Sequence, residues 1–396
     1  MKILCALGQH QYGDPARGLS TEYAAFLPAL RNLGHDVVHF ELWDRSRYAD
    51  YAHMNRLLLE AVDRECPEVL LTVQLQYELF IETLAAVRQR GDAATVCWTT
   101  DDSWKYREVS RFVGRYYHAM TTTYPDVVSA YHRDGISHVL PTQWAARSDR
   151  LCPPMPSHRC RYAVSFVGEA HGNRKQRIQQ LQNHGIFVSC FGYGWPHGPV
   201  SAEDVPKIMR DSIISLNFAN ARDRRNQIKA RTFEVPGAGG FLLTESAPDL
   251  ENWYIPDQEI AVFQNDRELI QKISLYLTHS DIRDRIATAG FNRTAADHTY
   301  EKRLASVLNF ALWAKNADKP AGAAHPVHSS AIDMPFQSDP WLHSLRKILV
   351  WVCQRIWGYT RGVRAARRIV FEISRRLVGE KTFSRSGWPA RMFPEL

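Results

Sequence analysis

The stretch Asn226–Glu245, NQIKARTFEVPGAGGFLLTE, carries the clearest indication of the fold in its half of the chain. A short helical segment with Lys229, Arg231 and Glu234 ends at a Pro-Gly-Ala-Gly-Gly turn, and the apolar run Phe241–Leu243 follows. A short helix that ends at glycines and leads into a buried strand is half of an α/β unit. The helix start and its cations suit a phosphate group, and the carboxylate suits a pair of ribose hydroxyls. We therefore expect this stretch to hold a nucleotide diphosphate.

Strand and helix signals alternate on both sides of this stretch. The predicted strands are Lys2–Leu7, Val37–Phe40, Val69–Val73, Thr95–Thr99, Ala119–Thr122, His138–Leu140, Ala163–Val167, Ile186–Phe191, Ile213–Asn217, Phe241–Leu243 and Glu259–Phe263. Strands that alternate with helices form parallel sheets covered on both faces. The fold class is therefore α/β, although the first strand is not followed by the GxGxxG of common dinucleotide-binding domains.

The proline-rich segment Pro141–Pro156 interrupts the alternation, which then starts again. We expect two doubly wound, Rossmann-like domains, residues 1–150 and 151–318, that face each other across a cleft. Residues 319–336 are rich in Ala, Pro, His and Ser, which is typical of a linker. Residues 337–396 form a C-terminal tail.

The tail carries the basic character of the protein. The formal charge is +7, and residues 337–396 hold 12 Lys/Arg against 4 Asp/Glu, which leaves 37 (49 − 12) against 38 (42 − 4) in the rest of the chain. Apolar residues and tryptophans alternate with these cations at helical spacing, and Gly358 and Gly362 are expected to split the tail into two helices. Basic amphipathic helices of this kind lie on anionic bilayer surfaces. Nucleic acid is the alternative partner, but nucleic-acid-binding tails usually lack an apolar face, so we expect none.

The cysteines and the hydropathy pattern indicate the compartment. The seven cysteines are scattered, odd in number and without a CxxC pair, as in proteins with reduced thiols. The first residues, MKILCALGQHQYGD, suit a first strand better than a signal peptide, and no stretch has the length of a transmembrane helix. The expected location is cytoplasmic, peripheral on the inner face of the plasma membrane.

Four segments of the chain resemble the carboxyl domain of the CgeB-like glycosyltransferases. They are KARTFEVPGAGGFLLTE, SFVGEAHGNRKQRIQQL (Ser165–Leu181), FGYGW (Phe191–Trp195) and DHTYEKRL (Asp297–Leu304). The resemblance covers Ala163–Leu308 well and the amino domain more loosely. It implies the two-domain GT-B fold and the transfer of a sugar from a nucleotide-diphosphate sugar.

The resemblance also implies roles for single residues. It assigns Glu234, just before the glycine turn, to the nucleotide ribose. Many retaining relatives carry a second Glu eight positions earlier that contacts the sugar, and this chain has Asn226 there. Arg174 stands where the related sequences have an Arg. No cofactor is implied beyond the donor substrate itself.

Several residues are candidates for donor binding. Arg174 and Lys175 could neutralise a diphosphate leaving group, where charge grows in the transition state, or could be a solvated helix start. Arg231 and Glu234 share a helix face and could instead be a surface ion pair. Gly192, Tyr193 and Gly194 could admit a nucleobase or form a plain turn. The full donor-binding set is Glu234, Arg231, Lys229, Arg174, Gly168, Gly192, Tyr193, Asn217, Asn226, Gly239 and Gly240.

Asp101, Asp102 and His10 are the candidates for the catalytic base. The two adjacent carboxylates follow a strand and repel each other, which raises one pKa, as a base requires. Helix capping is the alternative role for Asp102. His10 lies in the first loop, where a polar surface role is the alternative. The chain has no Asp-x-Asp sequence, so we expect a metal-independent reaction.

The expected function is therefore sugar transfer from a nucleotide-diphosphate sugar to a glycan or a lipid-linked acceptor. A sugar-nucleotide epimerase or hydrolase of the same fold is one alternative. A non-catalytic binding protein with a basic tail is another.

Overall fold

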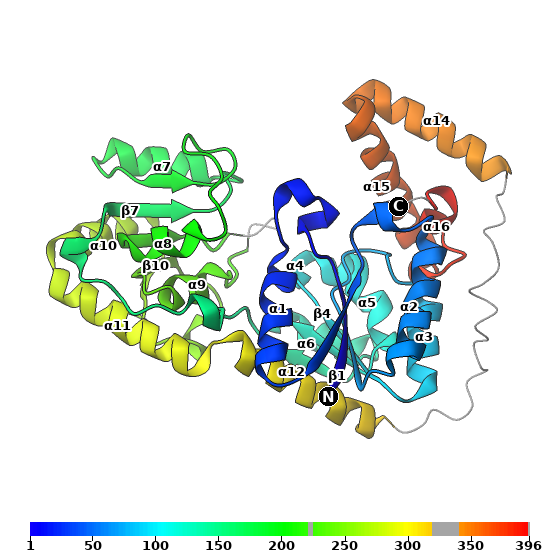
Figure 1. Cartoon of the computed structure of the whole chain (residues 1–396). Helices are drawn as coiled ribbons and strands as arrows, with labels where there is room; N and C mark the ends of the chain where they lie inside the picture. Colours follow the sequence, from blue (N-terminus) through cyan, green and yellow to red (C-terminus); the bar gives the residue numbers. More distant parts are fainter. Residues whose placement is uncertain (221–224, 319–339, 395–396) are drawn as a thin grey trace. The chain divides into compact units, whose positions relative to one another are not determined.

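The computed structural model describes residues 1–220, 225–318 and 340–394. It divides the chain into two compact units, Met1–Thr142 with Leu304–Leu396, and Gln143–Arg303 (Figure 1). The second boundary falls inside the helix α12 (Tyr300–Ala317), so most of this helix belongs to the first unit. The units thus change over at residues 142 and 303, whereas the sequence places the domain boundaries at 150 and 318.

A six-stranded, wholly parallel sheet forms the centre of the first unit. Its strands are β1 (Lys2–Leu7), β2 (Asp36–Glu41), β3 (Val69–Thr72), β4 (Ala94–Trp98), β5 (Ala119–Thr122) and β6 (Val139–Pro141), in the order β2-β1-β3-β4-β5-β6. The central strands β3 and β4 are buried along their whole length, and β1 is buried after its first residue, because helices cover both faces. These strands therefore have continuous apolar runs rather than alternating ones.

The helices of the first unit are short where the chain turns at the sheet edge and long where they cover its faces. They are η1 (Gln11–Gly13), η2 (Pro15–Arg17), α1 (Thr21–Asn32), η3 (Arg45–Arg47), α2 (Tyr51–Glu65), α3 (Ile81–Arg90), α4 (Asp102–Lys105), the π-helical turn η4 (Tyr106–Ser110), α5 (Arg111–Val113), η5 (Gly114–Tyr116), η6 (Pro125–Val127) and α6 (Val128–Arg133). Ser20 caps α1 and Asp50 caps α2, each through a hydrogen bond from a backbone N–H of the first turn.

The C-terminal segment is part of the first unit. It consists of α14 (Pro340–Trp357), α15 (Tyr359–Val378), η10 (Gly379–Phe383) and α16 (Trp388–Met392). The two long helices meet at Gly358, one of the glycines expected to separate them, while Gly362 lies inside α15. Within the described residues, no helix is both long and apolar enough to cross a membrane.

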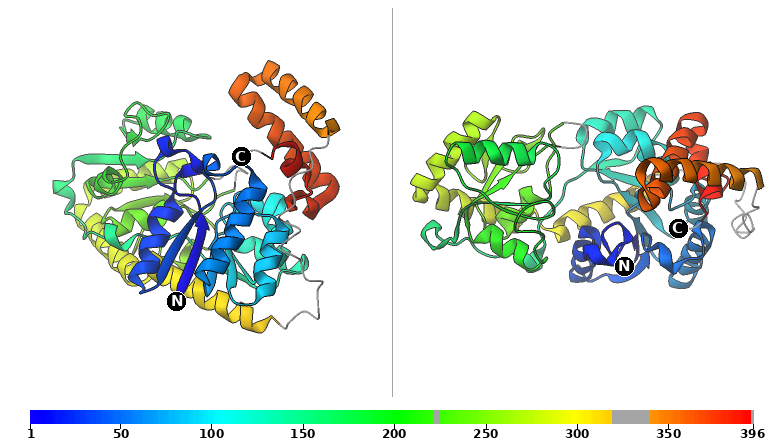
Figure 2. Two further views of the ribbon diagram at one scale, coloured as in Figure 1. Left: turned by 45° about the vertical axis from the view of Figure 1, so that its right-hand side comes forward. Right: turned by 90° about the horizontal axis from the view of Figure 1, so that it is seen from above.

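The second unit contains a five-stranded parallel sheet. Its strands are β7 (Tyr162–Val167), β8 (Ser189–Phe191), β9 (Ser212–Asn217), β10 (Leu242–Glu245) and β11 (Ala261–Phe263), in the order β11-β10-β9-β7-β8. The surrounding helices are η7 (Ser148–Arg150), η8 (Ser157–Arg159), α7 (Arg174–Asn183), α8 (Asp204–Arg210), α9 (Arg231–Gly237), η9 (Leu250–Asn252), α10 (Asp266–Thr278) and α11 (Ser280–Asp297). The two views of Figure 2 show helices on both sides of this sheet.

Each sheet has a point where the strand order reverses. It lies between β1 and β3 in the first unit and between β7 and β9 in the second. Ligands of doubly wound sheets bind outside the carboxyl ends of the strands at such points, because the connecting loops diverge there. Two parallel-sheet α/β units are confirmed, and the sheet of each has one such reversal point.

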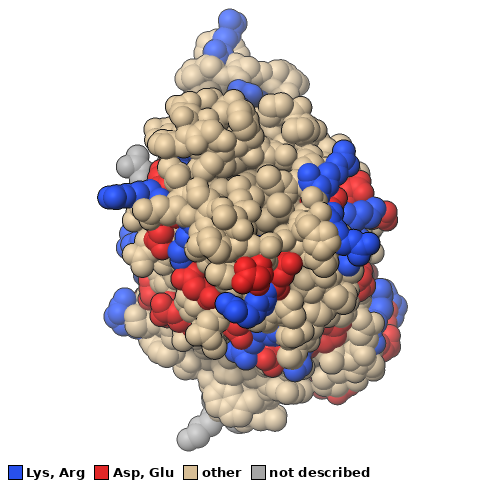
Figure 3. All heavy atoms as spheres, turned by 90° about the vertical axis from the view of Figure 1, so that its left-hand side faces the viewer, with Lys and Arg blue, Asp and Glu red and all other residues tan. Residues whose placement is uncertain are grey.

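The charges outside the tail are balanced, as the sequence indicates. On the face of the molecule that Figure 3 shows, Lys and Arg side chains are interspersed with Asp and Glu.

Candidate functional site

The loops after β7 and β8 meet at the carboxyl edge of the second sheet, where β7 borders the reversal point. Gly168 N donates to Phe191 O at 2.8 Å, and Trp195 Nε1 donates to Gly168 O at 2.8 Å. A side chain at Gly192 would place its Cβ 2.4 Å from Gly168 O, and Gly192 has a φ of 126°. Both conditions require glycine, because only glycine lets the two backbones approach so closely. Tyr193, at the tip of the second loop, has 51% of its surface exposed.

Arg174, the first residue of α7, is a buried cation at this edge. Only 7% of its surface is exposed, and its guanidinium lies 5.3 Å from the centre of the Phe166 ring. Nη1 donates to Glu169 O at 3.0 Å, whereas the buried Nε has no hydrogen-bond partner in the described part of the chain. Burial, followed by the charge of Arg231, lowers the pKa of Arg174 to about 10. A buried cation with an unsatisfied donor is costly, which indicates that an anion completes its surroundings.

Further cations gather around Arg174. Burial lowers the pKa of His171, and the positive charges of Arg174 and Lys229 lower it further. Arg231 acts on Arg174 in the same way. Four basic side chains, which lie in the loop after β7, at the first residues of α7 and α9 and just before α9, are therefore close enough here to influence one another's charge. Such a concentration of like charge at a strand–helix junction is suited to a phosphate or a diphosphate.

Glu234 faces this cluster from α9. Its Oε2 forms an ion pair with Arg231 Nη1, one helical turn earlier, and Arg231 Nε donates to Val167 O at 3.1 Å. Within the described residues, Glu234 Oε1 accepts no hydrogen bond. The ion pair considered as an alternative is thus present, and it fixes the carboxylate at the end of β7 with one oxygen available to a hydroxyl donor.

Asn217 and Asn226 also lie at the carboxyl edge, where each makes a contact within the protein. Asn217 is buried at the end of β9 and donates from Nδ2 to Thr244 Oγ1 at 2.9 Å. Asn226 Nδ2 donates to Ser246 O at 2.8 Å, which ties the segment before α9 to the end of β10. The carboxylate side chain of a glutamate at position 226 has no N–H group and could not donate this hydrogen bond.

Gly239 and Gly240 support packing away from the cations. A Cβ at Gly239 would lie 2.4 Å from Cys152 O, and a Cβ at Gly240 would lie 2.5 Å from Met209 O. Gly239 also has a φ of 80°. These glycines therefore let the end of α9 pack against other backbone segments of the second unit, a role that does not require a ligand.

Arg177 is the main residue of this edge that the sequence analysis missed. It is buried and donates to Glu245 Oε1 at 2.9 Å and to Asp266 Oδ1 at 2.5 Å. Glu245 Oε2 in turn accepts from Ala219 N at 2.9 Å. Arg177 thereby connects α7, β10 and α10 and fixes the loop after β9. Its position one turn after Arg174 in the basic segment HGNRKQR was the available signal.

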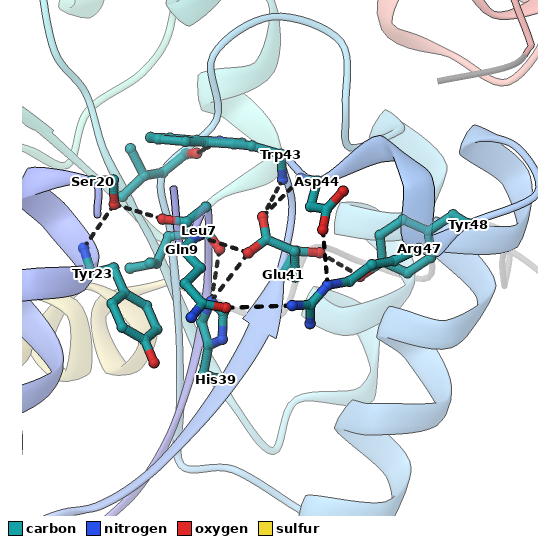
Figure 4. Close-up of polar contacts among 12 residues, drawn as sticks. Leu7, Gln9, Ser20, Tyr23, His39, Glu41, Trp43, Asp44, Arg47 and Tyr48 are labelled. Carbon is teal, nitrogen blue, oxygen red and sulfur yellow. Dashed lines mark hydrogen bonds and ion pairs between the residues drawn. The ribbon is translucent and has the colours of Figure 1, made fainter. Parts of the chain in front are cut away.

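The loop after β1 is the corresponding feature of the first unit. Glu41, at the end of β2, is buried, and its carboxylate accepts from Trp43 N at 2.6 Å, Asp44 N at 2.9 Å and Gln9 N at 2.7 Å (Figure 4). These bonds hold the loops after β1 and β2 together at the carboxyl edge of the sheet, where β1 borders the reversal point. His10 follows Gln9 and buries its Nδ1 without a hydrogen-bond partner in the described residues.

Asp101 and Asp102 have different surroundings, although they are adjacent. Asp102 is fully buried and accepts hydrogen bonds from Thr99 Oγ1 at 2.6 Å, Ser110 Oγ at 2.7 Å and Tyr131 OH at 2.7 Å. Burial raises its pKa, and these hydroxyls oppose that effect. Asp102 therefore holds the junction of β4 and α4 together and is not placed to touch a substrate.

Asp101 is partly exposed and has a φ of 58°, which is unusual for a residue other than glycine. Strained backbone of this kind is frequent at functional sites. Glu22, in the first turn of α1, lies close enough to feel the charges of Asp101 and Lys105. Burial raises the pKa of Glu22, while the charges of Lys105 and Asp101 act on it in opposite directions. No feature of the sequence singles out Glu22.

No group of three or more His, Cys, Asp or Glu side chains in the described part of the chain could hold a metal ion.

The comparisons with known proteins agree with this geometry. Residues 174–309 match the model of a glycosyl transferase-like family. This segment begins at Arg174 and includes α9 and the strands around it. No curated protein shows a significant sequence match to the chain.

Solved structures share the fold of about four fifths of the chain. Sucrose-phosphate synthase from Thermosynechococcus elongatus superposes with a TM-score of 0.56 at 11% identity, over 80% of this chain and all of the other. A glycosyltransferase from Rickettsia africae ESF-5 superposes with a TM-score of 0.53 at 12% identity, over 80% of this chain and 99% of the other. Anabaena Alr3699/HepE in complex with UDP-glucose superposes with a TM-score of 0.52 at 11% identity, over 78% of this chain and 99% of the other. These similarities show a GT-B fold.

Proposed function

Because the chain is a glycosyltransferase with a GT-B fold, we propose that it transfers a sugar from a nucleotide-diphosphate sugar to a hydroxyl acceptor. The observation that carries this proposal is the buried guanidinium of Arg174, with its unpartnered Nε, among Arg231, Lys229 and His171. A diphosphate offers Arg174 Nε the acceptor oxygen that the described part of the protein does not supply. The resemblance to the CgeB-like group supports membership of that subfamily as part of this proposal.

The donor is held mainly by the second unit. Arg174, Arg231 and Lys229 bind the diphosphate, and Glu234 Oε1 accepts a hydrogen bond from a ribose hydroxyl. Gly168, Gly192 and Tyr193 border the nucleoside. UDP and UDP-glucose appear in the complexes of the Anabaena protein, which favours a uridine donor here.

The chemistry needs a base and a stabilised leaving group. The acceptor hydroxyl oxygen bonds to the anomeric carbon while the bond from that carbon to the β-phosphate oxygen breaks. The hydroxyl proton passes to a base, for which Asp101 and His10 are the candidates, and the electron pair stays on the diphosphate. The cations around Arg174 stabilise this growing charge, so the reaction proceeds without a metal ion.

The acceptor belongs to a cell-surface glycan or a lipid-linked precursor and is bound by the first unit. This assignment is supported by the basic C-terminal segment, which favours a cytoplasmic protein at the inner face of the membrane.

The test is a binding and product analysis. The full chain is titrated with UDP, GDP, ADP and their sugars by calorimetry, and micromolar affinity for one series is expected. The selected sugar nucleotide is then incubated alone and with membrane extract as a source of acceptor. The proposal would be refuted if the chain bound none of the nucleotide diphosphates or their sugars. Rapid release of free or epimerised sugar without extract would show a hydrolase or an epimerase instead.

A further inference from the structure

The helix α14 exposes an apolar face that its own unit does not cover within the described residues. Trp341, Leu345, Ile348 and Val352 recur at spacings of four, three and four residues, so they share one face of the helix. Their exposed fractions are 60%, 46%, 62% and 38%. Two more large residues, Trp351 and Ile356, flank this face and are also exposed. We call these six residues the α14 face.

A second side of α14, next to the α14 face, supplies the contacts that hold the helix in place. Leu342 and Cys353 are buried in a cluster with Val370 of α15 and with Met392 and Phe393 at the C-terminal end. The helix is therefore apolar on two sides, and the α14 face is not needed for this packing.

The helical hairpin is fixed to the sheet of the first unit through α15 and η10. Arg368 pairs with Glu108 at 2.7 Å, and the Phe371 ring stacks on Tyr77 with 5.7 Å between ring centres. Figures 1 and 2 both show α14 beside α15 at the periphery of this unit. The α14 face is thus presented on a support that is folded onto the catalytic protein.

The charges beside this face are positive. The helix contains Arg346, Lys347 and Arg355 and has no Asp or Glu. Arg361 and Arg364, at the start of α15, are exposed and form no ion pair within the described residues. A second copy of the chain would bring the same cations against them, which disfavours self-association through this face. Exposed tryptophans and aliphatic residues bordered by Lys and Arg are instead suited to the interface of an anionic bilayer.

We propose that α14 lies in the headgroup region of an anionic lipid bilayer, with the α14 face toward the acyl chains and α15 as its support. The proposal goes beyond sugar transfer and does not depend on it. It differs from a general role for the basic tail, because α15 uses Phe371 and Arg368 to bind its own protein rather than lipid.

Vesicle flotation with the full chain tests the proposal. The vesicles consist of phosphatidylcholine alone or of phosphatidylcholine with phosphatidylglycerol, and the parent chain is expected to float with the second kind. The variant Trp341→Ser/Ile348→Ser/Trp351→Ser is expected to reduce the bound fraction about tenfold or more, because the buried apolar area drives insertion. Lys347→Gln/Arg355→Gln is expected to reduce it less and to weaken its dependence on salt.

The matched control is Phe187→Ser/Ile255→Ser/Leu277→Ser, which removes three exposed apolar side chains from the second unit. It is expected to float as the parent does, and circular dichroism with thermal unfolding confirms that each variant is folded. Undiminished flotation of the α14 triple variant would overturn the proposal. So would a lipid-independent dimer, seen by analytical ultracentrifugation, that the same triple variant abolishes, because the α14 face would then be an interface between copies.

Discussion

Arg231 pairs with Glu234 one turn later in α9, so two groups assigned to different parts of one ligand are held together by the protein itself. The pair is oriented because Arg231 also donates to Val167 O at the end of β7. An i, i+3 pair of this exposure contributes little to stability on its own. Its position at the carboxyl edge therefore matters more than its strength.

Glu234→Ala should weaken binding of the nucleotide diphosphate without unfolding the second unit. Loss of a hydrogen bond to a charged acceptor costs about 1.5 to 3 kcal/mol, which corresponds to about a 10- to 100-fold loss of affinity. Stability should change by less than about 1 kcal/mol. Calorimetric titration and thermal unfolding measure the two effects. Asp204→Ala, which breaks the i, i+3 pair with Lys207 in α8, is the control and should leave affinity unchanged. Equal affinities of both variants would contradict the ribose role.

Arg174→Met should separate binding from stability. The variant keeps most of the apolar stem on Phe166 but removes a buried charge whose Nε has no partner, so thermal stability should stay equal or rise. Affinity for the diphosphate should fall about 100-fold, since charge-assisted bonds to phosphate are lost. A large loss of stability would instead show that Arg174 is a structural residue.

Arg177→Met is the matched comparison on the same helix. Arg177 is equally buried but paired with Glu245 and Asp266, so its removal leaves carboxylates uncompensated and should cost about 3 kcal/mol or more. Opposite effects of the two substitutions on unfolding are the expected result.

Asn226→Glu should lower the stability of the second unit by about 1 to 2 kcal/mol. The glutamate cannot donate to Ser246 O and would place its carboxylate against that carbonyl. Asn226→Gln keeps an N–H donor and is the control. Denaturation followed by circular dichroism measures the difference, and a glutamate variant as stable as the parent would show that this hydrogen bond is unimportant.

The sequence predicts the fold well because each strand and helix is indicated by a pattern of neighbouring residues. Continuous apolar runs such as Lys2–Leu7 identify buried parallel strands, and the positions of Arg174 and Glu234 follow from the strands they adjoin. Parallel strands place such residues at one edge of the sheet. The roles of Arg174 and Glu234 in ligand binding remain predictions.

Properties that depend on distant segments could not be predicted in the same way. Asp101 and Asp102 look alike in the sequence, but Tyr131 and Ser110 enclose only the second. The glycines Gly239 and Gly240 read as a possible ligand loop, whereas their close neighbours are the backbones of Cys152 and Met209. Likewise, helical spacing in the tail did not show which apolar residues pack on the first unit and which stay exposed.

Phe371→Ala should show that the C-terminal segment stabilises the first unit. The Phe371 side chain is buried between Tyr77 and Phe383, and such a truncation typically costs about 3 to 5 kcal/mol. Hydrogen exchange should accelerate in peptides from α2 and α3. Ile348→Ala, on the exposed α14 face, should change stability by less than about 0.5 kcal/mol. If the C-terminal segment did not pack on the first unit, both variants would change the free energy of unfolding by the same small amount.

Lowering the pH should destabilise the first unit through His118. Thr95 N donates to His118 Nδ1 at 3.0 Å, and burial lowers the pKa of this imidazole to about 4, with the charge of Arg88 acting in the same direction. The unfolded chain, with an ordinary histidine pKa of about 6.5, binds a proton more readily than the folded one. Stability is therefore fully present above pH 6.5 and falls between about pH 6.5 and 4.

For this single group, the free energy of unfolding should decrease by about 1 to 2 kcal/mol between pH 7 and pH 5. His118→Asn removes the titration, so its thermal midpoint should depend less on pH than that of the parent, even though the variant is less stable at pH 7. His132→Asn, at an exposed histidine of α6, should keep the parent's dependence. The same pH dependence in the parent and in His118→Asn would mean that other groups, such as His298, whose pKa burial also lowers to about 4, control the acid sensitivity.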